Sequence, residues 1–218
     1  MKFFVDSAEI KEISELVEMG IVDGVTTNPS LIYKSGKDFK TVIKEISEIV
    51  KGPISAEVTS NVREEMISQG LELSKISENI VIKVPLTKNG LMACKVLSSN
   101  KIKVNVTLCF SPSQAILAAK MGASFISPFI GRIDDISGEG LNLIKDITEI
   151  YSNYITSFKT EVLVASVRSP LQIVQVAKMG AHIVTVPPKI ITQMLKHPLT
   201  DVGLEAFLND WKKTGQKL

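Results

Sequence analysis

The chain has 218 residues, of which 44% are hydrophobic, and its formal net charge is +2 at pH 7. This length and hydrophobic content suffice for the core of one domain and argue against long-range disorder. The sequence has no block of like charge, so neither a nucleic-acid-binding stripe nor a membrane-surface patch is expected. The two cysteines, Cys94 and Cys109, follow no metal-binding or redox spacing, and we expect buried thiols in a reducing compartment.

The N-terminal segment Met1–Asp6 runs directly into a strand-like pattern that ends in an acid. It has no charged segment followed by a long apolar stretch, so no secretory signal peptide is expected. The apolar runs elsewhere are shorter than a membrane-spanning helix requires. These features predict a soluble protein of the cytoplasm.

Short apolar runs alternate with helical patterns along the whole chain. The expected strands are Phe3–Asp6, Gly24–Thr27, Ile54–Val58, Ile80–Val84, Val104–Leu108, Phe125–Pro128, Val162–Ser166 and Ile183–Val186. Between them the apolar residues recur about every 3.6 residues, which predicts helices. Alternating strands and helices indicate parallel strands with helical crossovers. Eight such units favour a closed (β/α)8 TIM barrel over a doubly wound sheet, and we expect residues 1–218 to form this single domain.

An internal repeat supports this interpretation. Ser111-Pro112-Ser113-Gln114 is echoed by Ser169-Pro170-Leu171-Gln172, and each is followed by Ala-Lys-Met-Gly-Ala, at residues 119–123 and 177–181. Ser before Pro is typical of a helix start, and Gly of a helix end. A helix and its following strand therefore recur as a unit. The alternative is a chance similarity between two surface helices.

Two further helices are expected after the eighth strand, at Lys189–Lys196 and about residues 201–213. The second has an apolar stripe with the i, i+3, i+4, i+7 spacing of a helix face, formed by Leu204, Phe207, Leu208 and Trp211. Because the barrel already has its eight helices, we expect this stripe to cover an end of the barrel or to dock on a neighbouring subunit.

Polar residues stand near the ends of the expected strands, where the inward side chains of a barrel should be bulky and apolar. These residues are Asp6, Thr26, Asn28, Glu57, Lys83, Asn105, Thr107, Ser127 and Ser166. The carboxyl ends of barrel strands are where barrel enzymes build their active sites. A single such residue could be a helix cap, but polar residues on seven of the eight strands predict an active site.

Lys83 is the most informative of these residues, because it interrupts the apolar run Ile80–Pro85. A lysine in such a strand either reaches water or is held where charge is disfavoured. The neutral amine is the form that attacks a carbonyl. The alternative is an edge-strand lysine that faces solvent, and the neighbouring acids Asp6 and Glu57 argue against it.

Arginine usage points to a phosphate group. Among the 25 cationic residues the arginines are Arg63, Arg132 and Arg168, and the last two follow strand ends. The planar guanidinium group binds phosphate in a bidentate way that lysine cannot match. A surface salt bridge is the alternative for either residue alone.

Other chemistries have less support. The two histidines, His182 and His197, cannot supply a three-histidine zinc site, and both are expected to be structural. The sequence has no glycine-rich nucleotide fingerprint and no nucleophile elbow. We therefore expect neither a metal nor a cofactor.

The strand-end motifs resemble those of the transaldolase family. They are Gly24-Val25-Thr26-Thr27-Asn28-Pro29-Ser30, Ile82-Lys83-Val84-Pro85, Asn105-Val106-Thr107, Ser127-Pro128-Phe129, Gly131-Arg132-Ile133-Asp134 and Ala165-Ser166-Val167-Arg168. The resemblance runs from Phe3 to Trp211 without a gap, and the chain length is similar to that of the small-subunit transaldolases.

The resemblance implies a class I mechanism in which Lys83 forms an imine with the carbonyl of a ketose phosphate. Asp6 would take the proton from the hydroxyl group next to the breaking carbon–carbon bond and later return it. Glu57 and Thr107 would hold a water molecule that carries protons during imine formation and hydrolysis. The dihydroxyacetone part would be hydrogen-bonded by Thr26, Asn28, Asn105 and Ser127. The phosphate would be held by Arg132, Ser166 and Arg168.

The resemblance also implies a donor, an acceptor and an assembly. A dihydroxyacetone unit would pass from fructose 6-phosphate or sedoheptulose 7-phosphate to erythrose 4-phosphate or glyceraldehyde 3-phosphate, as in the non-oxidative pentose phosphate pathway. The small-subunit relatives are pentamers or decamers, so a homo-oligomer is expected. Its contacts would give the Leu204–Trp211 stripe a neighbour to dock on.

Two other activities stay open. The chain also resembles the fructose-6-phosphate aldolases, but these carry Gln where Glu57 stands and Tyr where Phe129 stands. Glu57 and the substrate-binding residue Phe129 therefore favour transaldolase. A barrel that only binds sugar phosphate, as a sensor or structural protein, is the other alternative. It would not need two proton-transfer groups such as Asp6 and Glu57.

Overall fold

The structure is a computed structural model that describes residues 1–217, and these residues form a closed barrel of eight parallel strands in chain order. The strands are β1 Lys2–Asp6, β2 Gly24–Thr26, β3 Ile54–Glu57, β4 Ile80–Pro85, β5 Val104–Cys109, β6 Phe125–Pro128, β7 Glu161–Val164 and β8 Ile183–Val186. Strand β8 pairs with β1 and closes the barrel. The prediction of a (β/α)8 barrel is confirmed, and the strand ends shift only slightly from those expected.

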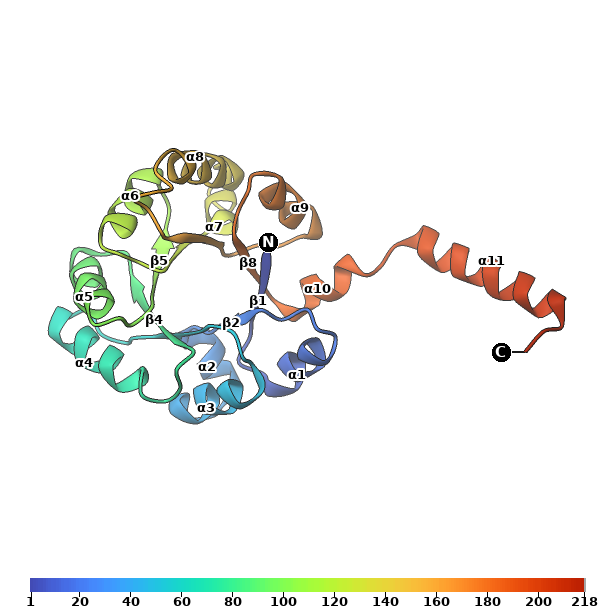
Figure 1. Ribbon diagram of the computed structural model, residues 1–218, viewed down its shortest axis with the longest axis horizontal. Helices are drawn as coiled ribbons and strands as arrows, with labels where there is room; N and C mark the ends of the chain where they lie inside the picture. Colours follow the sequence, from blue (N-terminus) through green and yellow to red (C-terminus); the bar gives the residue numbers. More distant parts are fainter. Residues whose placement is uncertain (218) are drawn as a thin grey trace.

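Helices surround this barrel, except the C-terminal one, which extends away from it (Figure 1). They are α1 Ile10–Glu18, α2 Pro29–Ser35, α3 Phe39–Ile49, α4 Arg63–Leu73, α5 Lys88–Ser99, α6 Pro112–Lys120, α7 Ile130–Asp134, α8 Gly140–Asn153, α9 Pro170–Lys178, α10 Pro188–Met194 and α11 Pro198–Thr214. Among residues 1–217, no helix is long and apolar enough to cross a membrane.

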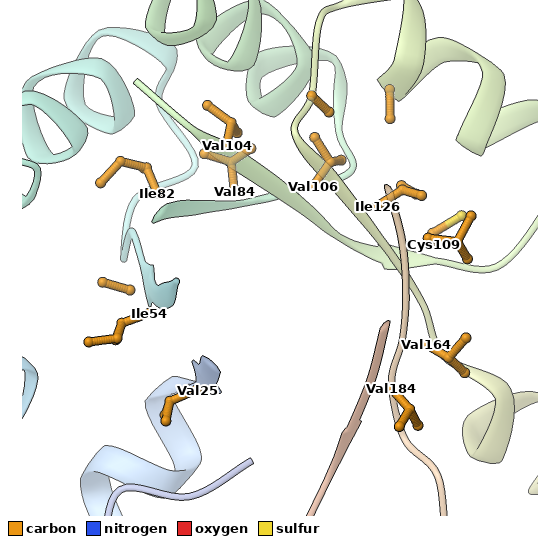
Figure 2. Close-up of a cluster of buried hydrophobic side chains, with 14 of the residues drawn as sticks. Val25, Ile54, Ile82, Val84, Val104, Val106, Cys109, Ile126, Val164 and Val184 are labelled. Carbon is orange, nitrogen blue, oxygen red and sulfur yellow. The ribbon is translucent and has the colours of Figure 1, made fainter. Parts of the chain in front are cut away.

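The outward faces of the strands form the larger hydrophobic core. Valine and isoleucine side chains from neighbouring strands point away from the barrel axis toward the helices (Figure 2). Ile82 and Val84 of β4 and Val104 and Val106 of β5 are all fully buried. Because side chains alternate between the two faces of a strand, the residues between these positions point into the barrel. The face that packs on the helices therefore determines which residues line the interior.

The inward faces form a second, smaller core in the lower part of the barrel. It consists of Phe4, Val81, Phe125, Leu163 and Ile183. The rings of Phe4 and Phe125 meet edge to face, with their centroids 6.2 Å apart. On four of these strands the next inward position, two residues further along, is polar: Asp6, Lys83, Ser127 and Thr185. The barrel interior is thus apolar below and polar at its carboxyl end.

The internal repeat corresponds to two matched helix starts. Ser111 and Ser169 cap α6 and α9, and the serine Oγ accepts a hydrogen bond from the backbone N–H of Gln114 and Gln172, respectively. Gly122 and Gly180 follow these helices with φ of 81° and 79°, a conformation that glycine adopts without strain. The repeat is therefore a structural unit.

The repeat also includes a residue that lies three positions before each capping serine. Leu108 and Ser166 stand at equivalent positions and have φ of 63° and 60°. Side chains other than glycine seldom adopt this left-handed conformation, which costs about 1–3 kcal/mol and often marks a functional site. The sequence did not indicate these two strained residues, and both lie at the carboxyl end of the barrel.

Helix α11 extends away from the barrel (Figure 1). It begins at Pro198, and the Nδ1 atom of His197 accepts a hydrogen bond from the Leu199 N–H at its first turn. The side chains of its apolar stripe are exposed in the described chain, with Phe207 at 76% and Trp211 at 40%. The stripe therefore does not cover an end of its own barrel. Docking on a neighbouring subunit stays a prediction.

Candidate active site

A pocket of about 440 Å³ lies at the carboxyl ends of the strands. Most of the side chains predicted for the site line it: Asp6, Thr26, Asn28, Glu57, Lys83, Thr107, Ser127, Phe129, Arg132 and Ser166. They come from different strands and strand-to-helix loops, so closure of the barrel brings together residues that are far apart in the sequence. The two other predicted residues, Asn105 and Arg168, lie outside this pocket lining.

Lys83 lies deep in the pocket on β4, and its residue is 5% exposed. Its Nζ donates a hydrogen bond to the backbone carbonyl of Thr27 at 2.9 Å and lies 3.0 Å from Oε2 of Glu57. The strand register sets this contact, because Glu57 of β3 is directly opposite Lys83. A solvent-facing edge-strand lysine is thereby excluded, since the closed barrel leaves β4 paired on both sides.

Thr107 lies on β5, one strand beyond Lys83, and is 1% exposed. Its Oγ1 is buried and has no hydrogen-bond partner within residues 1–217. A buried hydroxyl group without a partner is costly and calls for an explanation. Because Thr107 lines the same pocket as Glu57, an unsatisfied hydroxyl and a carboxylate both face the space beside the lysine.

Asp6 ends β1 and contributes the second carboxylate of the pocket. Its Oδ1 accepts a hydrogen bond of 2.7 Å from the hydroxyl of Thr26. Burial raises the pKa of Asp6, and the Thr26 hydrogen bond and the positive charge of Lys83 oppose this shift. A carboxyl group whose pKa is moved upward, beside an amine in a pocket, is typical of a proton-transfer site.

Thr185 is a pocket residue that the sequence reasoning missed. It lies on β8, lines the pocket, and its Oγ1 is 2.6 Å from Oγ1 of Thr26. The signal was present, because Thr185 alternates in phase with the inward Ile183 between the outward Val184 and Val186. Threonine is common in β-strands, so a single threonine in a valine-rich strand cannot be distinguished by sequence from a residue that only forms the strand.

Asn105 lies beneath the pocket and is fully buried. Its Nδ2 donates to Oγ of Ser55 at 3.1 Å, and its Oδ1 accepts from Oγ of Ser127 at 2.8 Å. Ser55 was also missed, although it precedes Glu57 by two residues on the same strand face. This arrangement fixes the Ser127 hydroxyl, whose proton points to Asn105 and whose oxygen faces the pocket. In the structure, Asn105 thus supports the pocket from below.

Asn28 follows β2 and caps α2. Its Oδ1 accepts a hydrogen bond of 3.0 Å from the Leu31 N–H, and its backbone is extended. A helix cap of this kind holds the side chain in one orientation. Asn28 therefore lines the pocket from a fixed position.

Arg132 is the arginine that lines the pocket, together with Ser166. Its guanidinium carbon lies 4.9 Å from the centroid of the Phe129 ring, a cation–π distance. The neighbouring Gly131 N–H donates to the Ser166 carbonyl at 3.0 Å. A Cβ atom at Gly131 would lie 2.3 Å from that carbonyl oxygen, so only glycine permits this approach. This close approach holds Arg132 beside Ser166, the residue with the strained backbone, at one edge of the pocket.

Arg168 lies at the rim and is bound elsewhere. Its guanidinium group forms a bidentate ion pair with Asp135, which follows α7. It lines an adjoining cavity of about 340 Å³, which shares Asp6, Ser166 and Thr185 with the main pocket. Arg132 and Arg168 thus line different cavities that meet at Ser166. The third arginine, Arg63, lies near Glu64 and lines neither of these two cavities.

Within the described part of the chain, no three His, Cys, Asp or Glu side chains are grouped so that they could hold a metal ion. The chemistry available in the pocket is that of the buried Lys83 amine, two carboxylates, hydroxyl groups, the Asn28 amide and the further cations Lys34 and Arg132. Such a set can form an imine, transfer protons and bind an anion.

Comparison with known proteins agrees with this geometry. The family model described as transaldolase/fructose-6-phosphate aldolase matches residues 3–218. The chain is 60% identical to a "Probable transaldolase" of Chelativorans sp. (strain BNC1), 59% identical to one of Paracoccus denitrificans (strain Pd 1222) and 56% identical to one of Thermoanaerobacter sp. (strain X514). Each of these matches covers 100% of both chains. A buried lysine paired with Glu57 in a pocket that Asp6 also lines, together with these full-length matches, shows that the chain is an enzyme of the transaldolase/fructose-6-phosphate aldolase family.

Proposed function

We propose that this enzyme is a cytoplasmic transaldolase of the non-oxidative pentose phosphate pathway. It moves a dihydroxyacetone unit from fructose 6-phosphate or sedoheptulose 7-phosphate to glyceraldehyde 3-phosphate or erythrose 4-phosphate. The observation that carries the proposal is the position of Lys83 Nζ, which is buried in the pocket and 3.0 Å from Glu57. The relatives named probable transaldolases support it.

Imine formation is the first step of the proposed mechanism. The Glu57 carboxylate is placed to accept the proton that the Lys83 ammonium must lose, and the neutral amine then attacks the ketose carbonyl carbon. The resulting carbinolamine loses its hydroxyl group as water, for which a proton returns from Glu57. The buried Thr107 hydroxyl would hold that water, and the same groups reverse the step during hydrolysis.

Cleavage of the carbon–carbon bond is the second step. Asp6 takes the proton from the substrate hydroxyl next to the breaking bond, and the bonding electrons move into the imine, which becomes an enamine. The shortened aldose phosphate leaves as the first product. The acceptor aldehyde then enters, the enamine carbon attacks its carbonyl, and Asp6 returns the proton to the new alkoxide.

Substrate hydroxyl groups would be bound by the fixed side chains of the pocket. Ser127 donates its proton to Asn105, so its oxygen is set to accept a hydrogen bond from the dihydroxyacetone part. Thr26 is set in the same way by Asp6, and Asn28 adds its amide group. Such fixed partners orient the reacting carbon toward Lys83.

The phosphate would bind at the edge where Arg132 and Ser166 meet. Arg132 supplies the charge within the pocket, and Arg168 adds charge from the rim. Because Asp135 engages both sides of the Arg168 guanidinium, a direct contact between Arg168 and phosphate requires this ion pair to open.

Borohydride trapping tests the proposal and separates transaldolase from aldolase. Reduction in the presence of fructose 6-phosphate is expected to add one dihydroxyacetone unit to the peptide that contains Lys83, as read by peptide mass. Adding an aldose phosphate acceptor before the borohydride should lower the labelling, because the enamine passes its dihydroxyacetone unit to the acceptor and yields a new ketose phosphate. Release of free dihydroxyacetone at a steady rate without an acceptor would instead favour the aldolase. An unmodified Lys83 peptide in folded protein would refute both.

We also propose that the enzyme is a homo-oligomer, a pentamer or decamer, in which α11 docks on a neighbouring copy. An exposed apolar stripe of this size is unusual on a monomer. Replacing Phe207 and Trp211 together by serine is expected to lower the mass measured by analytical ultracentrifugation to that of a smaller species. The matched change of Lys212 and Lys213 to serine should leave the mass unchanged. A wild-type protein that sediments as a monomer would refute this proposal.

A further inference from the structure

A chain of hydroxyl groups crosses the barrel mouth and ends on Asp6. The Oγ1 atom of Thr185 on β8 lies 2.6 Å from Oγ1 of Thr26 on β2. The same Thr26 Oγ1 lies 2.7 Å from Oδ1 of Asp6 on β1. Both threonines are buried, at 4% and 2% exposure. The three residues thus form one connected group on three neighbouring strands.

The direction of these hydrogen bonds follows from the number of protons. An ionised carboxylate can only accept, so Thr26 must donate its single hydroxyl proton to Asp6. The proton between the two threonine oxygens must then come from Thr185. With Asp6 ionised, the chain therefore runs from Thr185 to Thr26 to Asp6.

Other buried threonines bond differently. Thr27 donates to the Ser55 carbonyl at 2.9 Å, and Thr160 donates to the Ala123 carbonyl at 2.6 Å. A backbone carbonyl is the usual partner for a buried hydroxyl. Thr185 instead donates to the one side chain that contacts the Asp6 carboxylate, and it lines both the main pocket and the adjoining cavity. A backbone carbonyl would satisfy the Thr185 hydroxyl equally well, so the need for a hydrogen bond does not explain why Thr185 lies beside Thr26.

We infer that Thr185 is a positioning residue for Asp6. By donating to Thr26, it holds that hydroxyl in the rotamer that points its proton at Oδ1. The Asp6 carboxylate is then fixed, and its second oxygen is the one that receives the proton of the substrate hydroxyl. This last step rests on the proposed function, whereas the orientation of Asp6 does not.

Replacing Thr185 by valine tests the inference, because valine keeps the shape and removes the donor. The Thr26 bond to Asp6 should weaken, and the hydrogen bond that favours the ionised carboxylate is partly lost. The pKa of Asp6 is therefore expected to rise in this variant. Turnover is expected to fall roughly 10-fold with little change in KM, and the acid limb of the kcat profile should move to higher pH.

The titration of Asp6 can be followed by its infrared carboxyl band, which is identified by its absence in Asp6→Asn. Thr185→Ser should restore both the titration and the turnover, since serine keeps the hydroxyl. Thr160→Val is the matched control, because it removes a buried hydroxyl far from Asp6, and it should change neither.

An unchanged Asp6 titration in Thr185→Val would overturn the inference. So would equal effects of Thr185→Ser and Thr185→Val. If the wild type turned over no sugar phosphate, the proposed function would fail, but the infrared comparison would still decide the role of Thr185. The two failures are therefore distinguishable.

Discussion

Lys83→Met is expected to lower turnover by roughly 10⁴-fold or more, because methionine fills the same space without an amine that can form an imine. The side chain is buried between β3 and β5, with Glu57 and Thr27 around its nitrogen, so the variant loses the amine that lies beside Glu57. Turnover should be measured by the formation of the new ketose phosphate from donor and acceptor.

Lys88→Met is the matched control for this variant. Lys88 is exposed at the start of α5, and its replacement should leave turnover within about twofold, as for surface substitutions away from a site. Borohydride should label the control and leave Lys83→Met unlabelled. Turnover above about a tenth of the wild-type value in folded Lys83→Met would rule out a covalent lysine mechanism.

Asp6→Asn is expected to change turnover and stability in opposite directions. Turnover should fall by about 10²–10⁴-fold, the usual contribution of a positioned proton-transfer group. Imine formation at Lys83 does not need Asp6, so borohydride should still trap the ketose on the variant without cleavage of the carbon–carbon bond. Loss of trapping and turnover together would assign Asp6 to imine formation instead.

The stability change follows from the direction of the Asp6 shift. Burial raises the pKa of Asp6 in the folded protein, so the carboxyl group favours folding below its unfolded pKa, and this contribution is lost as pH rises through the folded pKa. Asn has no charge to bury. Near neutral pH the variant should be more stable in urea than the wild type, and the difference should shrink toward about pH 4, the unfolded pKa of Asp.

Asp38→Asn is the matched control with the opposite sign. Asp38 caps α3, and the hydrogen bonds from Thr41 lower the pKa of its exposed carboxyl group. Its contribution is present above the unfolded pKa and is lost as pH falls through the folded pKa. Asp38→Asn should therefore be less stable than the wild type near neutral pH. An Asp6→Asn variant with the same pH trend as Asp38→Asn would contradict the assigned direction.

Much of the fold could be predicted because period-two patterns distinguish the two faces of each strand. Lys83 and Glu57 were found in this way, since a charge in a run of valine and isoleucine has few structural explanations. The pattern gives the face but not the depth of a residue, so it did not indicate that Asn105 lies beneath Ser127, fully buried. Its role as a substrate-binding residue, which the family resemblance implies, stays a prediction. How far below the pocket an inward side chain lies depends on the tilt of the strands in the closed barrel, and the local sequence pattern does not give this tilt.

Two other features depend on contacts between distant segments. The Thr185–Thr26 hydrogen bond exists only because β8 closes onto β1. The ion pair of Arg168 with Asp135 joins two loops that follow different strands. Sequence reasoning identified Thr26 and Arg168 but not Thr185 and Asp135, the residues that bind them.

The apolar lower half of the barrel has a consequence for the order of events. The inner core below the pocket fills the amino-terminal half of the barrel, so substrates and products cannot pass through that face. It consists of Phe4, Val81, Phe125, Leu163 and Ile183. In the proposed reaction, the aldehyde product therefore leaves, and the acceptor aldehyde enters, through the carboxyl-terminal mouth of the barrel, one after the other. An excess of acceptor should obstruct the donor, and double-reciprocal plots of the initial velocities should be parallel lines.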